Sequence, residues 1–442
     1  MEENTQLYGN AREAALRALM QVDQEGAYAQ IAANAVLKAR RISPEDARLM
    51  TEIVYGVTRM RAALDHIIDK LVKDPAKLEL TVRQILRIGI YQLLYLEKIP
   101  DSAAVNESVK MAKKYANPGA ASLVNAVLRN TLRKGGLAML PTADDEEDYL
   151  AITLSHPRWL VKRLLKEYGF EAAEAFCRFD NRRPEVCLRV DTRRTSREEL
   201  RGLLRWQGIT GRAGELAPEA LYVSGGSPEQ MAEFAEGLCT VQGEASMLAS
   251  RALAPQPGDL VLDMCAAPGG KTTHLAQLMN DEGQIYAFDI HPHKVELIRE
   301  NAKRMQLGCI TAEVADAATL PARFAGKADC VLLDAPCSGL GVLASRSDAR
   351  WRKKRTDIAI LAKLSYQLLL AACDCLKPGG RLVYSTCTVA HEENGDNIEK
   401  LLAERPDMEL LPTDICPEGT RQLLPHLDGV EGFYIASLRK KA

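Results

Sequence analysis

The sequence has no pair of cysteines at the Cys-x-x-Cys spacing and no apolar run near 18 residues, although it holds eleven cysteines in 442 residues. The first absence argues against a zinc site, and the second argues against a transmembrane helix. An odd number of scattered cysteines and no signal-peptide pattern favour a reducing compartment. We therefore expect a cytoplasmic protein without membrane or metal partners.

Two nucleotide-binding motifs are also missing around the loop Asp263-Met264-Cys265-Ala266-Ala267-Pro268-Gly269-Gly270-Lys271-Thr272. A phosphate-binding loop needs glycine where Cys265 stands, and the dinucleotide fingerprint Gly-x-Gly-x-x-Gly is absent. An apolar run before the loop and helical spacing after it still predict a strand, a tight turn and a helix start, which favours an anionic group. Asp289 ends the next apolar segment, where a carboxylate can reach ribose hydroxyls. The combination favours a nucleoside without pyrophosphate, of which S-adenosylmethionine is the common one.

The net charge of −2 hides an asymmetry along the chain. Residues 1–137 contain 20 Lys and Arg against 15 Asp and Glu, a net of +5, which leaves −7 for the remainder. Gly135-Gly136 and the acidic run 144–148 are typical of a solvated linker. The length suits two or three domains, and we expect them at residues 1–140, 149–254 and 255–442.

The first of these domains has helix signals and almost no strand signals. Apolar residues follow the 3.6-residue period, and Ser43-Pro44, Asp74-Pro75 and Asn117-Pro118-Gly119 mark breaks. Residues 10–19 and 117–129 resemble the first and last helices of the NusB family, which implies an all-α, RNA-binding module. Lys113 and Lys114, near its end, could contact a phosphate backbone or belong to an ordinary solvated helix face.

The middle region has mixed signals. A helix is expected after His156-Pro157, a strand at 184–191, and a capping box at Ser196 and Glu199 starts another helix. These elements predict a small α+β region of the RRM-like kind, containing a βαβ-like unit. Trp206 belongs either to an apolar helix face or to a base-stacking surface.

After residue 259 the pattern changes to alternating strands and helices. Apolar strands are expected at 260–262, 285–288, 330–333 and 382–384, and a long helix at 357–376. Buried strands joined by helices predict a doubly wound parallel sheet covered on both faces. Ligands bind such sheets at the carboxyl ends of the strands, at the topological switch point.

Acids and thiols follow those strand ends. Asp316, within Glu313-Val314-Ala315-Asp316-Ala317, follows a further strand expected between 285–288 and 330–333. Asp334 and Cys337 follow the strand at 330–333, and Cys387 follows the strand at 382–384. A lone buried cysteine is usually an apolar filler, but two cysteines at one rim favour a chemical role. A thiolate that adds to carbon 6 of a pyrimidine makes carbon 5 nucleophilic enough to accept a methyl group. Asp334 could hydrogen-bond the ring nitrogen as electron density builds there, and this reasoning does not rank the two cysteines.

Three segments carry a resemblance: 263–272, Asp334-Ala335-Pro336-Cys337-Ser338 and Ser385-Thr386-Cys387. They resemble the motifs of RNA cytosine-5 methyltransferases of the Nop2/Sun family. The resemblance implies a Rossmann-like methyltransferase domain, Cys387 as the nucleophile and Cys337 as the thiol for product release. It also implies that S-adenosylmethionine is held by Cys265, Ala266, Ala267, Pro268, Gly269, Gly270, Lys271, Asp289, Asp316 and Asp334.

The sequence departs from that family after the Asp-Ala-Pro-Cys loop. These proteins usually have a basic stretch with a proline there, whereas this chain reads Ala344-Ser345-Arg346-Ser347-Asp348-Ala349-Arg350-Trp351, with serine in place of the proline. The run that follows still interleaves an aromatic residue with cations, as in single-strand binders, through Arg350, Arg352, Lys353 and Arg355. These residues are expected either to contact RNA or to form a solvated helix start.

These observations predict a monomeric enzyme that methylates carbon 5 of one cytosine in 16S ribosomal RNA. The target base would be unpaired or flipped, because its ring carbons are unreachable inside a stack. The same chemistry on transfer RNA is an alternative, although the NusB-like domain favours ribosomal RNA. A non-catalytic ribosome assembly factor is another, and the pair Cys337 and Cys387 argues against it.

Overall fold

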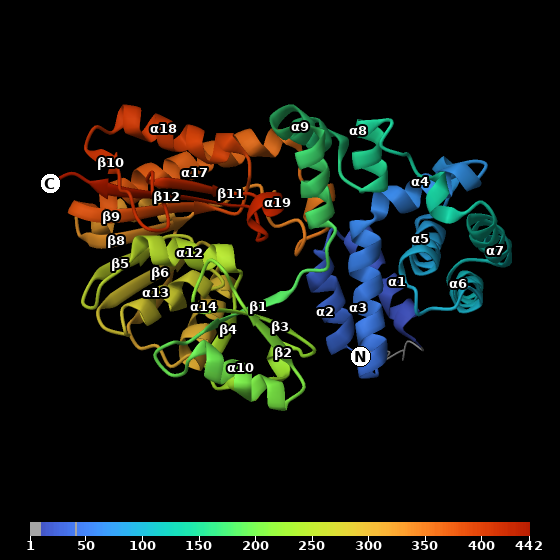
Figure 1. Cartoon of the computed structure of the whole chain (residues 1–442), viewed down its shortest axis with the longest axis horizontal. Helices are drawn as coiled ribbons and strands as arrows, with labels where there is room; N and C mark the ends of the chain where they lie inside the picture. The colour runs from blue at the N-terminus through green and yellow to red at the C-terminus, as the bar shows by residue number, and fades with distance from the viewer. Residues whose placement is uncertain (1–9, 40–41) are drawn as a thin grey trace. The chain divides into compact units, whose positions relative to one another are not determined.

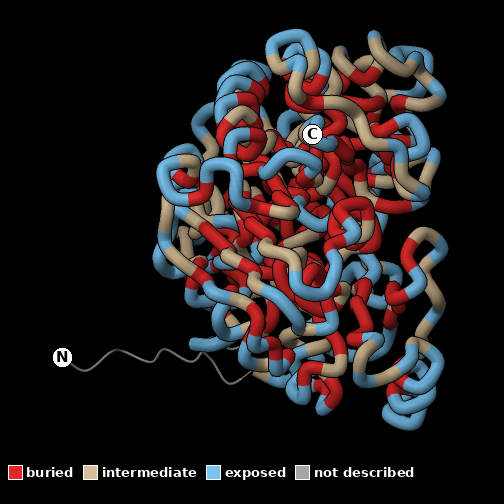
Figure 2. The backbone as a smooth tube through the Cα atoms, turned by 90° about the vertical axis from the view of Figure 1, so that its left-hand side faces the viewer, coloured by how far each residue is buried: buried red, intermediate tan, exposed pale blue. Residues whose placement is uncertain are grey.

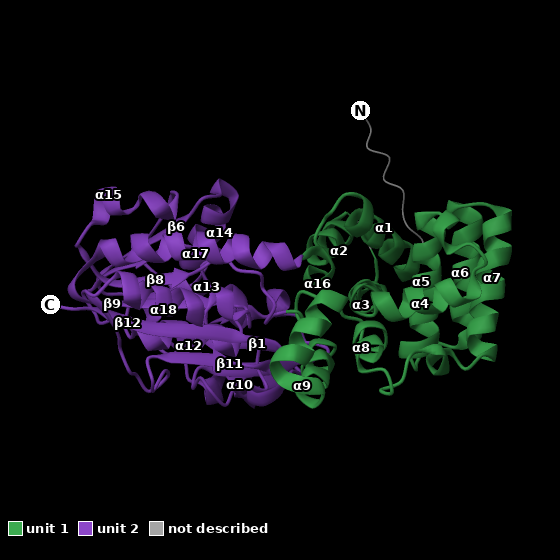
Figure 3. Ribbon diagram, turned by 90° about the horizontal axis from the view of Figure 1, so that it is seen from above, with its two compact units in different colours: residues 1–182, 343–353 green, residues 183–342, 354–442 purple. Residues whose placement is uncertain are grey.

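The computed structural model describes residues 10–39 and 42–442, and the chain divides into two compact units (Figure 3). The helical unit comprises residues 1–182 and 343–353, and the sheet unit comprises residues 183–342 and 354–442. The middle region expected at 149–254 is thus divided, because residues 149–182 pack with the helical unit.

Some helices of the helical unit begin at residues whose side chains cap them. Asn10 accepts from the backbone of Arg12 and Glu13, and Asn117 accepts from Ala120 N at 2.8 Å. The elements are α1 Ala11–Gln24, α2 Ala29–Lys38, α3 Pro44–Arg59, α4 Arg61–Leu71, η1 Pro75–Lys77, α5 Leu80–Tyr95, α6 Asp101–Tyr115, α7 Pro118–Arg133, η2 Gly136–Met139, α8 Glu146–Asp148, η3 Tyr149–Thr153, α9 Arg158–Asp180 and α16 Ala349–Arg352.

One apolar core joins α1 to α7 in this unit. Its buried members recur at helical spacing, for instance Ile85, Leu86 and Ile90 on α5. Over the whole chain, buried stretches (red in Figure 2) lie towards the inside and exposed stretches (blue) lie on the outside. The all-α domain predicted from the sequence is confirmed.

The sheet unit begins with a small antiparallel sheet in the order β2-β3-β1-β4 (Figure 1). The predicted capping box is present at Ser196 and Glu199 and starts the helix between β1 and β2. Since β3 lies between β1 and β2, the expected βαβ-like unit is a split one, as in ferredoxin-like folds. The elements are β1 Val186–Val190, α10 Arg197–Trp206, β2 Thr210–Ala213, β3 Ala220–Ser224, η4 Pro228–Gln230, α11 Ala232–Ala235 and β4 Cys239–Val241.

The second, larger sheet has the order β10-β12-β9-β8-β5-β6-β7, with β11 paired to β12. β5 to β9 are parallel, and β12 runs antiparallel beside β9. The order reverses between β5 and β8, which makes their carboxyl ends the switch point. The strands are β5 Leu260–Asp263, β6 Gln284–Asp289, β7 Ile310–Val314, β8 Ala328–Asp334, β9 Leu376–Thr386, β10 Met408–Leu410, β11 Thr420–Leu423 and β12 Phe433–Lys440.

Helices cover both faces of this sheet, so its central strands bury both sets of their alternating side chains. Val261 packs with α12 and α13, whereas its neighbour Leu262 packs with α17 and α18. The helices are α12 Glu244–Leu253, α13 Gly270–Leu278, α14 Pro292–Arg304, η5 Ala317–Thr319, α15 Pro321–Phe324, α17 Arg355–Cys375, η6 His391–Glu393, α18 Gly395–Glu404 and α19 Pro425–Asp428.

Among the described residues, α17 alone is long and apolar enough to cross a membrane by length and composition. More than half of its apolar window is buried in the protein, and Leu368, Leu369 and Cys373 belong to the sheet core. The core helix of a soluble protein has the same features, so α17 is explained by its place in the fold.

Candidate active site

Four carboxyl-terminal strand ends carry the polar residues that the sequence singled out. β5 ends at Asp263, β6 at Asp289, β8 at Asp334 and β9 at Thr386. In a parallel sheet such ends share one edge. The loops that follow β5, β8 and β9 therefore build one site.

The loop after β5 is held between its two neighbouring strands. Met264 N donates to Leu332 O at 3.0 Å, and Ala266 N donates to Phe288 O at 2.8 Å. Gly269 has a φ of +98°, and a Cβ there would lie 3.2 Å from the Ile298 backbone. Glycine is thus required both by the turn and by the approach of α14. The turn leaves the amino end of α13 at the site.

Asp263 lies beneath this loop with no exposed surface. Thr272 Oγ1 donates to its Oδ2 at 2.7 Å, whereas Oδ1 has no hydrogen-bond partner among the described residues. Burial raises the pKa of Asp263 to about 7. A buried acceptor without a partner beside a glycine turn fits a bound polar ligand, and the loop suits the nucleoside cofactor predicted from the sequence.

Asp334 and Lys271 form the charged part of the site. Lys271 Nζ lies 2.7 Å from Asp334 Oδ2 and 5.1 Å from the centre of the Phe433 ring. Ser385 Oγ donates to the other oxygen of Asp334 at 2.8 Å. The carboxyl group of Asp334 is therefore fixed in direction and stays partly exposed at the rim.

The two rim cysteines meet, with their sulfur atoms 3.3 Å apart. The neighbouring Cys387 sulfur, burial and the charges of Glu393 and Asp334 raise the pKa of Cys337 well above that of a free thiol. Cys337 thus keeps its proton and can donate it towards the Cys387 sulfur. The predicted convergence of these two residues on one site is seen in the structure.

The residues next to each cysteine bind the two loops together. The hydroxyls of Ser338 and Thr388 lie 2.8 Å apart, and Ser338 N donates to Glu393 Oε1 at 2.7 Å. Asn394 accepts from Thr386 Oγ1 at 2.5 Å and donates to Thr388 O at 3.0 Å, so it holds both sides of Cys387. From sequence, Glu392, Glu393, Asn394 and Asn397 are expected to begin a helix beside the active site, and their polar character soon after Thr388 is the one available signal for these bonds.

A second residue that sequence reasoning missed is Arg189 on β1, which has no exposed surface. Its guanidinium donates to Gly270 O at 2.5 Å, Thr273 Oγ1 at 2.9 Å and Gln277 Oε1 at 2.9 Å. It also contacts Gln242. Arg189 therefore joins the small sheet to the first turns of α13, directly behind the glycine turn.

The remaining predicted cofactor residues lie at the same edge. Asp289 is half-buried and accepts from His291 N at 2.9 Å, while Lys294 Nζ stands 3.9 Å from it. Asp316 is exposed after β7 and accepts from Ala318 N at 3.0 Å. Burial and nearby carboxylates raise the pKa of Cys265, so it is an unreactive thiol. Among the described residues, no group of three His, Cys, Asp or Glu is placed to hold a metal.

The basic run after the Cys337 loop is not one surface. Arg350 is only 1% exposed and donates to Ser155 O, Asn181 Oδ1 and Asp180 O within the helical unit. This burial corrects the expectation that Arg350 faces RNA, because a cation needs partners when it loses water. Arg352 bonds to Gly26 O at 2.5 Å.

The other predicted RNA-facing residues have accessible side chains. Lys353 is half-buried, Arg355 is exposed at the start of α17, and Lys113 is exposed on α6. Lys114 is 56% exposed and pairs with Glu13 at 3.0 Å. Trp206 is 93% exposed on α10, so it is not a core residue.

The fold and the site define the class of this protein. A parallel sheet of this order, with a glycine turn after its first strand and an acid at the end of its second, is that of a Rossmann-like methyltransferase dependent on S-adenosylmethionine. The small ferredoxin-like sheet and the helical unit precede it in the chain.

Comparison with known proteins identifies the family. Residues 250–439 match the family described as 16S rRNA methyltransferase RsmB/F, and residues 156–228 match the ferredoxin-like domain of RsmF/B-like methyltransferases. Residues 9–133 match the NusB family. The chain is 41% identical over 446 residues to the probable ribosomal RNA small subunit methyltransferase B of Bacillus subtilis, covering 98% of this chain and 99% of that protein. It is 35% identical to ribosomal RNA small subunit methyltransferase B of Klebsiella pneumoniae, with 98% of each covered.

The crystal structure of PH0851 matches 97% of this chain and 98% of its own, with a TM-score of 0.83 and 30% identity. The chain therefore belongs to the RsmB/F family of rRNA methyltransferases. The predicted fold class, the predicted cofactor and the prediction of an RNA methyltransferase are confirmed at this level.

Proposed function

We propose that the protein methylates carbon 5 of one cytosine in small-subunit ribosomal RNA through a covalent bond between Cys387 and carbon 6. The observation that carries this proposal is the 3.3 Å separation of the Cys337 and Cys387 sulfurs beside Asp334 and Lys271. A simple methyl transfer to oxygen or nitrogen needs no thiol. Carbon 5 of a pyrimidine does need one, because it is a weak nucleophile until carbon 6 is attacked.

Cys387 is the thiol that attacks. Its partner Cys337 has a raised pKa and keeps its proton, so Cys337 stabilises a Cys387 thiolate by donating a hydrogen bond to it. Asp334 hydrogen-bonds the ring nitrogen as electron density builds there, while Ser385 and Lys271 fix the direction of its carboxyl group. After methyl transfer a base takes the proton from carbon 5, the double bond between carbons 5 and 6 reforms, and the bond from carbon 6 to the Cys387 sulfur breaks, so that Cys387 leaves as a thiolate. Cys337 serves in this release.

The cofactor is held by the loop after β5 and by the acids at the following strand ends. The residues are Cys265, Ala266, Ala267, Pro268, Gly269, Gly270, Lys271, Asp289, Asp316 and Asp334. Bound there, S-adenosylmethionine supplies the methyl group at its sulfonium. Asp289 suits the ribose hydroxyls because it ends the second strand, and the loop backbone at α13 suits the carboxylate.

The roles of the two cysteines are tested by replacing each one with alanine. Cys387→Ala should reduce methyl transfer to background and retain cofactor binding. Cys337→Ala should accumulate a protein–RNA adduct that survives denaturing electrophoresis. An active Cys387→Ala enzyme would refute the nucleophile, and methylation without any adduct in Cys337→Ala would refute the release role.

The substrate is tested by mapping 5-methylcytosine in cells with and without the gene. We expect one cytosine of the small-subunit ribosomal RNA to lose its methyl group when the gene is deleted. Loss at a transfer RNA position would assign the same chemistry to the other substrate. Unchanged methylation in both RNAs would favour a non-catalytic assembly factor.

A further inference from the structure

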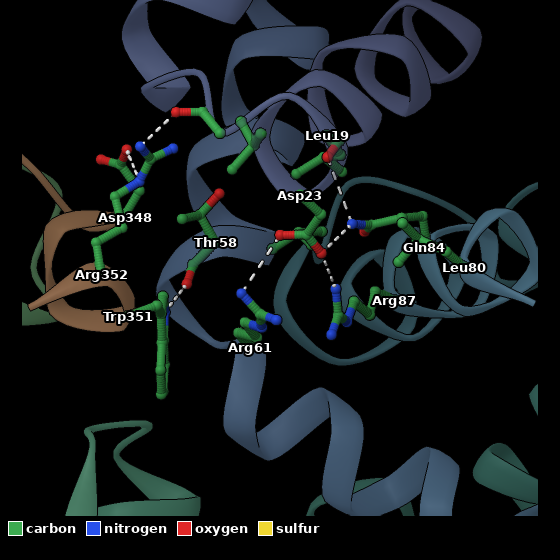
Figure 4. A pocket seen from close by; sticks show the side chains of 13 residues that line it. Leu19, Asp23, Thr58, Arg61, Leu80, Gln84, Arg87, Asp348, Trp351 and Arg352 are labelled. Carbon is green, nitrogen blue, oxygen red and sulfur yellow. Dashed lines mark hydrogen bonds and ion pairs between the residues drawn. The ribbon is translucent and has the colours of Figure 1, made fainter. Parts of the chain in front are cut away.

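The helical unit contains a cavity of about 370 Å³ that takes no part in the site described above (Figure 4). It is lined by α1, α3, α4, α5 and the segment 348–352. Ligand sites begin at roughly 300 Å³, so one nucleotide-sized group fits. Its walls are mixed: they include apolar side chains such as Leu19, Val57 and Leu80, the ring of Trp351, and arginine, glutamine and aspartate side chains.

The floor of the cavity is rigid and already neutralised. Asp23 accepts from Gln84 Nε2 at 2.8 Å and from Arg87 Nη1 at 2.9 Å. Arg87 also makes two bonds to Asp65, at 2.7 and 2.8 Å, and is buried. A fork that binds two carboxylates has little capacity left for a ligand. Arg87 therefore builds the floor and does not bind.

Arg61 differs from Arg87, because most of its N–H groups make no hydrogen bond among the described residues. Its single hydrogen bond among the described residues is a long one, 3.3 Å to Asp23, and 36% of its side chain is exposed. Burial and the neighbouring charge of Arg87 lower the pKa of Arg61. Most of its five N–H groups remain for an anionic or carbonyl group in the cavity.

Trp351 supplies a flat apolar wall opposite that cation. Its Nε1 donates to Thr58 O at 2.7 Å, which fixes the plane of the ring before any ligand arrives. Arg61 Cζ lies 6.0 Å from the ring centre. A planar group needs about 3.5 Å on each side, so a widening of about 1 Å would admit one between them.

Gln84 adds a hydrogen-bonding edge to the cavity. It is 1% exposed, and its Oε1 has no partner among the described residues. A buried acceptor without a partner is costly unless a ligand supplies a donor. An exocyclic amino group of a nucleobase is such a donor.

We propose that this cavity binds one unpaired nucleotide of the RNA substrate, stacked on Trp351 and contacted by Arg61. The proposal rests on RNA being the substrate, as proposed above. A flat ring, an amino edge and a phosphate together use every feature of the cavity. A carboxylate ligand would pair with Arg61 but would place no ring on the face of Trp351.

Tryptophan fluorescence tests this directly, because the chain has three tryptophans. Full-length protein carrying Trp159→Phe and Trp206→Phe keeps Trp351 as its single reporter. It is titrated with a labelled single-stranded oligoribonucleotide of about 12 nucleotides, a length that such grooves cover, and label anisotropy measures total binding. We expect saturable quenching of Trp351 at the same Kd as the anisotropy change.

Variants distinguish binding in the cavity from a general effect of removing positive charge. Arg61→Gln should weaken binding about tenfold, and Trp351→Phe should weaken it less than Trp351→Ala because Phe still stacks. Arg48→Gln is the matched control: Arg48 lies on α3, is 73% exposed and pairs with Glu45, so its loss should leave the quenching unchanged.

The outcomes distinguish the two proposals. RNA binding by anisotropy with a silent Trp351 would overturn the cavity proposal and leave the proposed function standing. Absence of RNA binding in both signals would overturn the proposed function and the cavity with it. Quenching by free cytidine or adenosine monophosphate at the same concentration as by the oligoribonucleotide would overturn the assignment to RNA.

Discussion

Arg350 in the helical unit and Arg189 in the sheet unit are both buried cations, and neither hydrogen-bonds a carboxylate. Arg350 donates to Ser155 O and Asp180 O and to Asn181 Oδ1. Arg189 donates to Gly270 O, Thr273 Oγ1 and Gln277 Oε1. Burial lowers the pKa of Arg350 to about 10 and the pKa of Arg189 to about 9.

The difference between the two lies in what surrounds them. The hydrogen bonds of Arg189 go to neutral groups of the turn after β5 and of α13, and Glu219 and Asp191 act on it through their charge. Arg350 stands beside Asp180, which is buried, lacks hydrogen bonds to its carboxylate among the described residues and lies 3.4 Å from His156. Arg189 thus bonds to the glycine turn of the candidate site, whereas Arg350 bonds within the helical unit beside a buried acid.

The largest effects on stability and on cofactor binding are expected when either buried arginine is removed. Arg350→Met and Arg189→Met should each lower the free energy of unfolding by roughly 3 kcal/mol, because several buried acceptors lose their donor. Only Arg189→Met should also weaken cofactor binding, since only Arg189 contacts the turn at Gly270. Chemical denaturation and calorimetric titration with S-adenosylmethionine measure the two effects.

Comparing Arg350→Met with Arg189→Met distinguishes a loss of stability from a loss of cofactor positioning. Equal losses of cofactor affinity in both variants, at temperatures where both are folded, would show that the effect is general destabilisation. An unchanged affinity in Arg189→Met would remove Arg189 from the cofactor site.

The titratable neighbours of Arg350 should make stability depend on pH. Burial raises the pKa of Asp180 to about 7 from an ordinary value near 4, so the folded protein holds a proton that the unfolded chain releases. This contribution is full below about pH 4 and is lost as the pH rises to 7. Burial and Arg350 lower the pKa of His156, which acts in the opposite direction as the pH rises through its ordinary value.

Asp180→Asn isolates the carboxylate. The variant should gain stability relative to the parent by about 2–3 kcal/mol between pH 5 and pH 8, the free energy of roughly two pKa units. Urea midpoints at both pH values measure the gain. A constant difference between the two proteins would show that Asp180 stays ionised in the folded state.

Neither arginine could be placed from the sequence. In the sequence Arg350 stands in a basic run, and burial requires Asp180 and Asn181, about 170 positions away. Arg189 lies in an ordinary strand and meets its partners some 80 positions later. Long-range partners of this kind leave no local pattern.

The parts that could be predicted follow local rules. Near-continuous apolar segments placed β5, β6, β8 and β9, and Ser196 with Glu199 placed the start of α10. The thiols at 337 and 387 were brought to one rim by the rule that parallel strands end at one edge. What the rule could not give is their contact, which depends on the Ser338, Thr388 and Glu393 bonds.

A conservative change sharpens the role of Arg189. Arg189→Lys keeps the charge and loses the planar fork, so it cannot reach Gly270 O, Thr273 Oγ1 and Gln277 Oε1 together. We expect about tenfold weaker cofactor binding with an unchanged kcat at saturating cofactor. A lower kcat with unchanged cofactor binding would move the role of Arg189 from the cofactor to the reaction.

The smallest effect on stability should come from an exposed cation. Lys113 on α6 is solvated, so Lys113→Gln should change the free energy of unfolding by less than about 0.5 kcal/mol. If it contacts a phosphate, the slope of log Kd against log salt for RNA should fall by about 1. Lys77→Gln, 85% exposed and paired with Asp74, is the control and should alter neither quantity. An unchanged slope in Lys113→Gln would restrict RNA binding by the helical unit to other residues, whereas a reduced slope would assign a phosphate contact to this exposed cation, in contrast to the buried Arg350.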